Sequence, residues 1–211
     1  MSVDPDELAV WIRAWAISRD RPPPAPAFGG WFVHVGQPDQ VARYVFARLD
    51  PVRLRTLGAA IREPHVLLKF PMNAAAVQSA LGAEWDAVRT GWFMRTDLDE
   101  GGGALPPGFT VTEAPGPCRQ YRLLCPRGEE AARARLTVLG AHAVVDGVDT
   151  EPAFRRQGLA SVLTRRLAAD ARAAGATVGL LTATDAGLQV YERLGWTVLG
   201  PWTTARLKEP G

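Results

Sequence analysis

The chain has 211 residues, enough for one large domain or two small ones, with 47% hydrophobic and 22% charged residues. This balance is typical of a soluble globular protein, and no apolar stretch is long enough to cross a bilayer. The formal net charge is +2, with arginines and acidic residues interspersed rather than gathered into a basic stripe. We therefore expect a cytoplasmic protein that binds neither nucleic acid nor membranes.

The first predicted element is a helix that begins at Asp4-Pro5-Asp6-Glu7, with a cap, a proline in the first turn and a glutamate three positions after the cap. It should end near Arg19. Its apolar stripe consists of Leu8, Trp11, Ile12 and Trp15. This stripe fits a homodimer or membrane contact, but packing against its own domain is the favoured interpretation. The proline-rich residues 21–27 predict a stiff, extended linker.

Residues 29–98 mix helix and strand signals and contain no catalytic motif. Strands are predicted at 31–35, 66–70 and 88–94, and helices at 40–48, 50–61 and 73–81. Residues 97–107 are polar and rich in glycine and proline, which makes them the best internal boundary. The predicted domains are therefore an N-terminal α/β region, 1–98, and a second domain, 99–211.

Four strands are predicted in the second domain, at 109–113, 119–125, 133–139 and 143–150. Cys118 and Cys125 flank the second of them, and their odd separation puts them on opposite faces. Their spacing matches no zinc pattern, so we expect two reduced thiols. The three histidines, His34, His65 and His142, are far apart in sequence, and we expect no metal.

Between the fourth strand and an amphipathic helix over 158–174 lies Arg155-Arg156-Gln157-Gly158-Leu159-Ala160. Small residues at the start of a helix let backbone N–H groups approach a ligand closely. A helix N-terminus also carries partial positive charge and unpaired donors, which suits a phosphate or pyrophosphate. Taken alone, such a glycine is as well explained by a tight turn.

The downstream pattern favours the phosphate interpretation. A short buried strand is predicted over 177–183, followed by a helix capped by Asp185 that ends in Tyr191-Glu192-Arg193-Leu194-Gly195-Trp196. This order of motifs resembles the GCN5-related N-acetyltransferase superfamily over about residues 107–207. Its first motif, Gln/Arg-x-x-Gly-x-Gly/Ala, matches Arg155–Ala160. Its last, Tyr-x-x-Leu-Gly-Phe, matches Tyr191–Trp196 with Trp in place of Phe.

The resemblance implies an α/β (α+β) fold: a twisted mixed sheet, mostly antiparallel, flanked by helices and preceded by the N-terminal α/β region. Strands 143–150 and 177–183 should be adjacent and parallel, joined by helix 158–174 as a right-handed crossover. The family has two helices between its first and second strands, whereas here only Ala114–Pro117 separates them. We expect residues 1–98 to supply that wall of the acceptor cleft.

The resemblance also implies acetyl-CoA as co-substrate. Its pyrophosphate should lie over the helix start, and its pantetheine arm between the splayed fourth and fifth strands, pairing with backbone near their ends. The residues expected to bind it are Val148, Asp149, Thr150, Arg155, Arg156, Gln157, Gly158, Leu159, Ala160 and Ser161.

Two residues are expected to be catalytic. Tyr191 matches the family's donor to the leaving thiolate, and a phenol, with a pKa near 10, can protonate a thiolate. Asp146 is the candidate base. Strand alternation puts it on one face with Val148 and Thr150, with Asp149 opposite, although Asp146-Gly147 also fits a bulge. His142 and a relay through water are the alternatives.

The predicted activity is therefore acyl-CoA-dependent N-acyl transfer, with acetyl passing directly to an amine of a small molecule or peptide in a ternary complex. The competing hypothesis is a non-catalytic acyl-CoA-binding sensor or interaction module on the same fold. Decarboxylation of a malonyl thioester is a remoter alternative.

Overall fold

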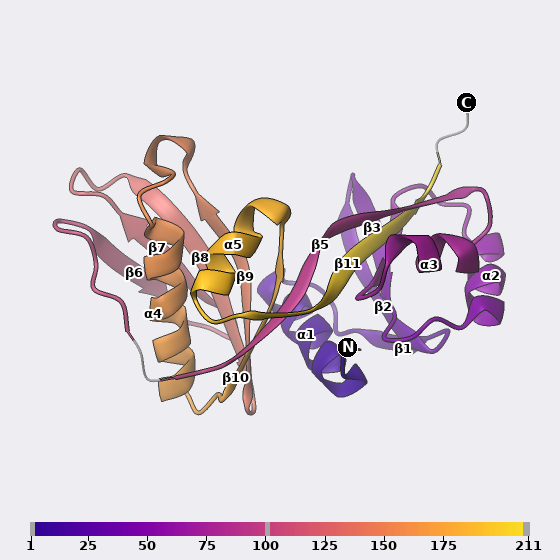
Figure 1. The fold of residues 1–211 in the computed structure, drawn as a ribbon, viewed down its shortest axis with the longest axis horizontal. Coiled ribbons are helices and arrows are strands. Elements are labelled where there is room, and N and C mark those ends of the chain that lie inside the picture. Colours follow the sequence, from indigo (N-terminus) through magenta and orange to yellow (C-terminus); the bar gives the residue numbers. More distant parts are fainter. Residues whose placement is uncertain (1–2, 100–101, 209–211) are drawn as a thin grey trace. The chain divides into compact units, whose positions relative to one another are not determined.

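The computed structural model describes residues 3–99 and 102–208, and these form five α-helices and eleven strands (Figure 1). They belong to two compact units. Unit 1 consists of the residues up to Phe93, Thr182–Asp185 and the residues from Val198, and unit 2 of Met94–Leu181 and Ala186–Thr197. The predicted domains are continuous segments, whereas unit 1 includes most of the C-terminal strand. Residues 100 and 101 of the predicted boundary lie outside the described residues.

Unit 1 has the strand order β1-β2-β3-β4-β11-β5. The strands β3 and β4 are parallel, and the pairs β1–β2, β2–β3 and β4–β11 are antiparallel. Its elements are α1 (Pro5–Ser18), β1 (Ala25–Ala27), β2 (Gly30–Gln37), β3 (Gln40–Val45), α2 (Pro51–Ala60), β4 (Val66–Phe70), α3 (Ala74–Ala80), and most of β5 (Trp85–Asp97) and β11 (Thr197–Leu207).

Unit 2 has the strand order β10-β9-β8-β7-β6. Its antiparallel pairs are β6–β7, β7–β8 and β8–β9, and β9 and β10 are parallel. Leu98 N donates to Thr177 O at 2.8 Å, just after β5 and just before β10. Its elements are β6 (Thr110–Ala114), β7 (Arg119–Leu124), β8 (Glu130–Leu139), β9 (His142–Thr150), a 3₁₀ turn (Pro152–Phe154), α4 (Leu159–Ala173), β10 (Val178–Ala183) and α5 (Asp185–Arg193).

The first helix forms as predicted. Asp4 caps α1 by accepting from Asp6 N at 2.8 Å, and Pro5 occupies the first turn. The predicted apolar stripe is buried within unit 1, where the Trp11 ring meets the rings of Phe93 and Trp202 edge-on, with centroids 5.8 and 4.9 Å away. The tryptophans therefore pack against the helix's own unit.

One predicted helix is wrong. Residues 40–45 form the strand β3, which pairs antiparallel with β2 and parallel with β4, instead of starting a helix over 40–48. The two residues between β2 and β3 form a tight hairpin turn, which brings Gln40 opposite Gln37. Alternation then buries Ala42 and Phe46 in the core cluster. Pairing on both sides outweighs the local helical pattern.

The predicted crossover is confirmed. Strands β9 and β10 are adjacent and parallel, with Val178 opposite His142 and Leu180 opposite Val144, and α4 joins them and packs on β8 and β9 (Figure 1). The helix buries Leu159, Leu163 and Leu167. The hydrophobic spacing of this segment therefore specified both the helix and its packed face.

The same sequence of elements occurs twice along the chain: an antiparallel hairpin, a crossover helix, a parallel strand, a helix and a final strand. The first series is β2, β3, α2, β4, α3, β5 and the second is β8, β9, α4, β10, α5, β11. The final strands are exchanged, because β11 pairs with β4 while β5 neighbours β10. No repeat was evident in the sequence.

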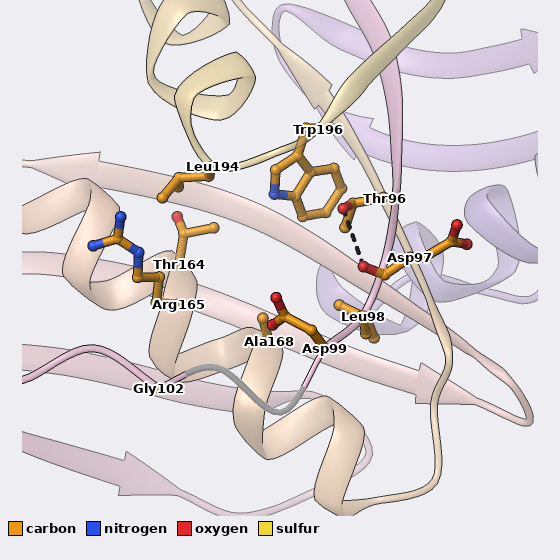
Figure 2. Close-up of a pocket in the computed structure, with 10 residues that line it drawn as sticks. All are labelled: Thr96, Asp97, Leu98, Asp99, Gly102, Thr164, Arg165, Ala168, Leu194 and Trp196. Atoms are coloured by element: carbon orange, nitrogen blue, oxygen red, sulfur yellow. Dashed lines mark hydrogen bonds between the residues drawn. The ribbon is translucent and has the colours of Figure 1, made fainter.

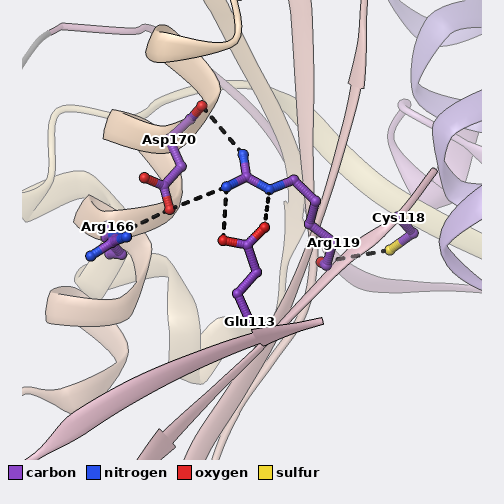
Figure 3. Close-up of polar contacts among 5 residues, drawn as sticks. All are labelled: Glu113, Cys118, Arg119, Arg166 and Asp170. Atoms are coloured by element: carbon purple, nitrogen blue, oxygen red, sulfur yellow. Dashed lines mark hydrogen bonds and ion pairs between the residues drawn. The ribbon is translucent and has the colours of Figure 1, made fainter. Parts of the chain in front are cut away.

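A cluster of charged side chains holds α4 against the edge of unit 2 (Figure 3). Arg119, on β7, donates to both Glu113 carboxylate oxygens, at 2.6 and 2.9 Å, and its Nη2 lies 3.6 Å from Asp170 Oδ2 on α4. Arg166 Nε donates to the same Asp170 oxygen at 2.9 Å. Two arginines and two carboxylates therefore tie β6 and β7 to α4, the helix whose start was predicted to bind phosphate.

Loss of one carboxylate from this cluster should be visible in stability. The hydrogen bond from Arg119 lowers the pKa of Glu113, so its contribution is present above the ordinary glutamate pKa and is lost as pH falls through the lowered value. Glu113→Gln should therefore lower the free energy of unfolding by about 1 kcal/mol at neutral pH and by less in acid. Urea titrations at both pH values measure this, and an equal loss at both would contradict it.

Candidate functional site

The start of α4 leaves its first backbone N–H groups without a capping side chain. Its N-cap, Gly158, is in the left-handed region at φ 76° and ψ 7°, and no side chain caps the helix. The first bond of the helix runs from Val162 N to Gly158 O, so the N–H groups of Leu159, Ala160 and Ser161 precede it. A Cβ on Gly158 would meet no atom within 4 Å. Open space therefore lies beside these donors, which fits a phosphate group.

The preceding loop brings the predicted arginines to this place. Residues 155–158 are all exposed, and Arg156 is also left-handed, at φ 62°. Arg155 Nε donates to Thr150 O at 3.1 Å, which anchors the loop to the end of β9. The residues between Thr150 and Ser161 that were predicted to bind acetyl-CoA therefore lie close together.

The corresponding helix of unit 1 is closed. Asp50 caps α2, and its Oδ1 accepts from Val52 N and Arg53 N, both at 3.1 Å. Pro51, in the first turn, has no N–H to offer. A carboxylate in this position both occupies the donors and repels an anion. Of the two crossover helices, only α4 offers a phosphate site.

We call the start of α4, with the N–H groups of Leu159, Ala160 and Ser161, the cradle. The two strands that lead to it, β9 and β10, separate as the family resemblance implies. The paired residues of β9 and β10 end at Val144 and Leu180, while β9 continues to Thr150 along β8. The backbone of β9 beyond Val144 is therefore unpaired with β10 within unit 2. This edge runs toward the start of α4, where an extended chain could add to it as a further strand.

A bulge corrects one prediction. Arg135 lies opposite Asp146 and Arg133 opposite Asp149, so three steps on β9 match two on β8, and Gly147 takes a φ of 61°. Because Arg133 and Arg135 share a face, Asp146 and Asp149 share one too, instead of pointing apart. Asp149 Oδ2 accepts from Arg133 Nη2 at 3.1 Å. The carboxylate of Asp149 is therefore already paired.

The two predicted catalytic residues come together. Burial, together with a smaller contribution from the nearby Asp146 carboxylate, raises the pKa of Tyr191 to about 12. The phenol is therefore protonated throughout the neutral range, as an acid must be. The Tyr191 ring meets Trp196 edge-on, with centroids 5.9 Å apart, which orients it.

Other side chains near Asp146 were missed in the sequence. Burial raises the pKa of the Cys118 thiol, and its neighbours include Thr137, Arg135 and Asp146. Only the register of β8 against β9 shows this, because Arg135 carries no motif of its own. The alternative base, His142, lies four residues before Asp146, about 13 Å away along the strand.

Asp185, which was predicted to cap α5, bonds to β5. It is the first residue of α5, and its carboxylate accepts from the Arg89 guanidinium and from Trp92 Nε1, at 2.8 Å for the indole. Both partners lie on β5, and all three residues belong to unit 1. The hydrogen bonds from Arg89 and Trp92 lower the pKa of this carboxyl group. Its role is to attach the start of α5 to β5.

A pocket in unit 2 adjoins the tyrosine's aromatic partner (Figure 2). Its lining residues are Thr96, Asp97, Leu98, Asp99, Gly102, Thr164, Arg165, Ala168, Leu194 and Trp196. The Thr164 hydroxyl is buried and has no hydrogen-bond partner among the described residues. Trp196 therefore contacts Tyr191 and also lines a small, mixed polar pocket beside α4.

Two absences concern the residues that the structure describes. No helix among them is long and apolar enough to cross a membrane. In the same residues, no three His, Cys, Asp or Glu side chains gather closely enough to hold a metal ion.

Comparison with known proteins agrees with this geometry. Residues 130–207, which include the cradle and Tyr191, match the family model described as FR47-like protein. This match covers less than half of the chain. No curated protein matches the sequence.

Solved structures share the fold. A GCN5-related N-acetyltransferase from Kribbella flavida aligns over 100% of this chain and 97% of its own, at 17% identity and a TM-score of 0.72. One from Sphaerobacter thermophilus aligns over 100% and 95%, at 13% identity and 0.60. A tandem GNAT protein from the clavulanic acid biosynthesis pathway aligns over 81% and 76%, at 14% identity and 0.56. The chain therefore has the fold of GCN5-related N-acetyltransferases, which confirms the predicted fold class.

The cradle can be closed by one substitution. Gly158→Asp would give α4 a carboxylate at its N-cap, as Asp50 does for α2. We therefore expect affinity for coenzyme A to fall at least about tenfold. Calorimetry should also give about one molecule bound per unmodified chain, because the start of α2 is blocked. Unchanged affinity in the variant would exclude this site.

The matched control is Gly140→Asp. Gly140 is also left-handed, at φ 58°, and a Cβ there meets no atom within 4 Å, but it lies at the turn between β8 and β9. It adds the same charge and a similar backbone strain away from the cradle. Its affinity for coenzyme A should match that of the unmodified chain.

Proposed function

We propose that this chain is an acyl-CoA-dependent N-acyltransferase that transfers acetyl from acetyl-CoA to an amine of a small molecule or peptide. The observation that carries the proposal is the uncapped start of α4, with open space beside Gly158. It lies at the end of β9, whose pairing with β10 has ended before that point. An anionic group on an extended arm fits this combination. A negatively charged donor with a long amide-bearing arm, such as coenzyme A, has both parts.

The proposed donor site is assembled from backbone rather than from side chains. The N–H groups of Leu159, Ala160 and Ser161 hold the pyrophosphate, and the exposed Arg155 and Arg156 add positive charge. The free edge of β9 from Val148 to Thr150 pairs with the amides of the arm. This pairing orients the thioester carbonyl for attack, which lowers the entropic cost of reaction.

Tyr191 and Asp146 divide the proton transfers. Tyr191 donates to the sulfur of the departing thiolate, and its raised pKa ensures that the proton is present. Asp146, which carries the charge next to that phenol, accepts the proton of the attacking amine directly or through water. The closeness of these two groups favours an enzyme over a sensor, because binding alone requires neither.

The direct test is incubation with acetyl-CoA and a panel of amines, with detection of the released thiol. Amine-dependent thiol release that fails in the Gly158→Asp variant supports the proposal. Binding of coenzyme A without release on any amine would favour the sensor. Formation of acetyl-CoA and CO₂ from malonyl-CoA, without an amine and without thiol release, would favour decarboxylation. The acceptor itself, and the role of residues 1–98 as its wall, stay predictions.

The role of Tyr191 can be measured separately. Tyr191→Phe removes one hydroxyl and keeps the ring against Trp196, so kcat should fall by about 10²–10⁴-fold while donor affinity is nearly unchanged. Because the pKa is about 12, the unmodified enzyme should not lose activity as pH rises through about 10, the ordinary phenol value.

The control is Tyr121→Phe, which removes the hydroxyl of a buried tyrosine on β7 whose ring lies under Arg119. It should leave kcat nearly unchanged. A Tyr191→Phe enzyme that turns over like the unmodified protein would assign that tyrosine a structural role only.

A further inference from the structure

Unit 1 contains a lysine that no part of the proposed mechanism uses. Lys69 lies on β4, where Val66, Leu68 and Phe70 are buried in the core cluster. Because side chains alternate along a strand, Lys69 points to the opposite face of the sheet. It is partly buried there, and the sequence has just one other lysine, Lys208.

The Lys69 amine ends a short chain of hydrogen bonds. Its Nζ donates to Thr204 Oγ1 at 2.7 Å, on the neighbouring strand β11. The hydroxyls of Thr204 and Thr90 are 2.8 Å apart, and Thr90 Oγ1 donates to Trp202 O at 3.3 Å. Since a hydroxyl has one proton, Thr204 must donate to Thr90. This chain of hydrogen bonds therefore uses one N–H group of Lys69, and it does not involve the nitrogen lone pair of the neutral amine.

The surroundings favour that neutral amine. Burial and the nearby Arg43 guanidinium lower the pKa of Lys69 to about 7. Arg43 is only 7% exposed, and it is held on β3 by Gln40 Oε1 at 2.8 Å and by the Trp15 ring at 3.5 Å. A cation fixed in this way cannot move aside when Lys69 gains a proton. An unprotonated amine is the form that attacks carbonyl groups.

We propose that Lys69 is a self-acylation site, at which the chain itself accepts an acyl group from an acyl thioester. The amine nitrogen attacks the thioester carbonyl carbon, an amide C–N bond forms and the C–S bond breaks. The thiolate leaves with the electron pair of that bond, and the proton released by the amine reaches it through solvent. The identity of the acyl donor rests on the proposed function, but the reactivity of Lys69 does not.

Lys208 provides an internal standard. It is exposed at the end of β11, where its Nζ donates to Ala83 O at 2.7 Å. An ordinary lysine is about 10³-fold less deprotonated at pH 7 than an amine with a pKa near 7. Lower basicity and partial burial offset part of this advantage. Lys69 should therefore react at least about tenfold faster than Lys208.

The first experiment measures reactivity without any enzymatic activity. The native chain is treated at pH 7 with a trace of isotopically labelled acetic anhydride, unfolded, and fully acetylated with the unlabelled reagent. Peptide mass spectrometry then gives the labelled fraction at each lysine. A labelling rate at Lys69 at least about tenfold above that at Lys208 supports the proposal. Equal or slower labelling at Lys69 overturns it, whether or not the chain is an acyltransferase.

The second experiment uses acetyl-CoA with the unmodified chain, Gly158→Asp and Lys208→Arg. Acetyl groups that accumulate at Lys69 in all three support the proposal and show reaction from solution. Loss in Gly158→Asp alone also supports it and shows that the cradle delivers the donor. No acetylation at Lys69 in the unmodified chain overturns it, even if amine acetylation proceeds, so the two proposals fail separately.

Thr204→Val tests the hydrogen-bond chain itself. This isosteric change removes the acceptor for the Lys69 N–H while keeping the buried volume of Thr204. The anhydride labelling ratio of Lys69 to Lys208 should change at least about threefold, because the amine is no longer oriented. An unchanged ratio in a folded variant would overturn the part played by the threonine chain.

Discussion

The short parallel ladder between β9 and β10 determines where the rest of unit 2 can lie. It pairs these strands in parallel, so α4 must return along the sheet to connect them, and the pairing extends only as far as Val144 and Leu180. The start of that helix then falls just past the free end of β9. An uncapped helix start and an unpaired strand edge are therefore neighbours because of the chain's connectivity. A longer ladder would have filled the edge with β10 itself.

The two crossover helices show how little sequence separates an uncapped helix start from a capped one. Both follow a hairpin and lead into a parallel strand, but α2 begins at Asp50-Pro51 and α4 begins at Gly158-Leu159. The aspartate satisfies the donors of its own helix and stabilises it by about 1 kcal/mol. The glycine leaves them unsatisfied, so α4 lacks this contribution. The cluster of charged side chains formed by Arg119, Glu113 and Asp170 holds the other end of α4.

Charge is distributed differently in the two units. In unit 2, burial and the nearby Asp146 carboxylate raise the pKa of the Tyr191 phenol, which suits an acid. In unit 1, burial and the nearby Arg43 guanidinium lower the pKa of the Lys69 amine, which suits a nucleophile. Both effects need partial burial, because water would screen the neighbouring charge. Each unit therefore places one titratable side chain where its uncharged form is favoured.

The sequence by itself determined the local features whose signals lie within a few residues. Caps specified the starts of α1, α2 and α3, hydrophobic spacing specified α4, and two ordered motifs indicated the fold. The same motifs predicted the start of α4 and Tyr191 as site residues. The bulge beside Asp146 was visible as an alternative in Asp146-Gly147. These succeed because capping, periodicity and turn preferences act over one or two turns of chain.

Tertiary structure alone decided what depends on distant partners. Residues 40–45 became a strand because β2 and β4 pair with them, and the strand at 197–207 was not predicted because its pairing with β4 is remote. Asp185 bonds to β5, and Asp149 shares a face with Asp146 because register overrides simple alternation. The Lys69 chain joins three strands. Such pairings are set by the register of segments far apart in sequence, which no local pattern encodes.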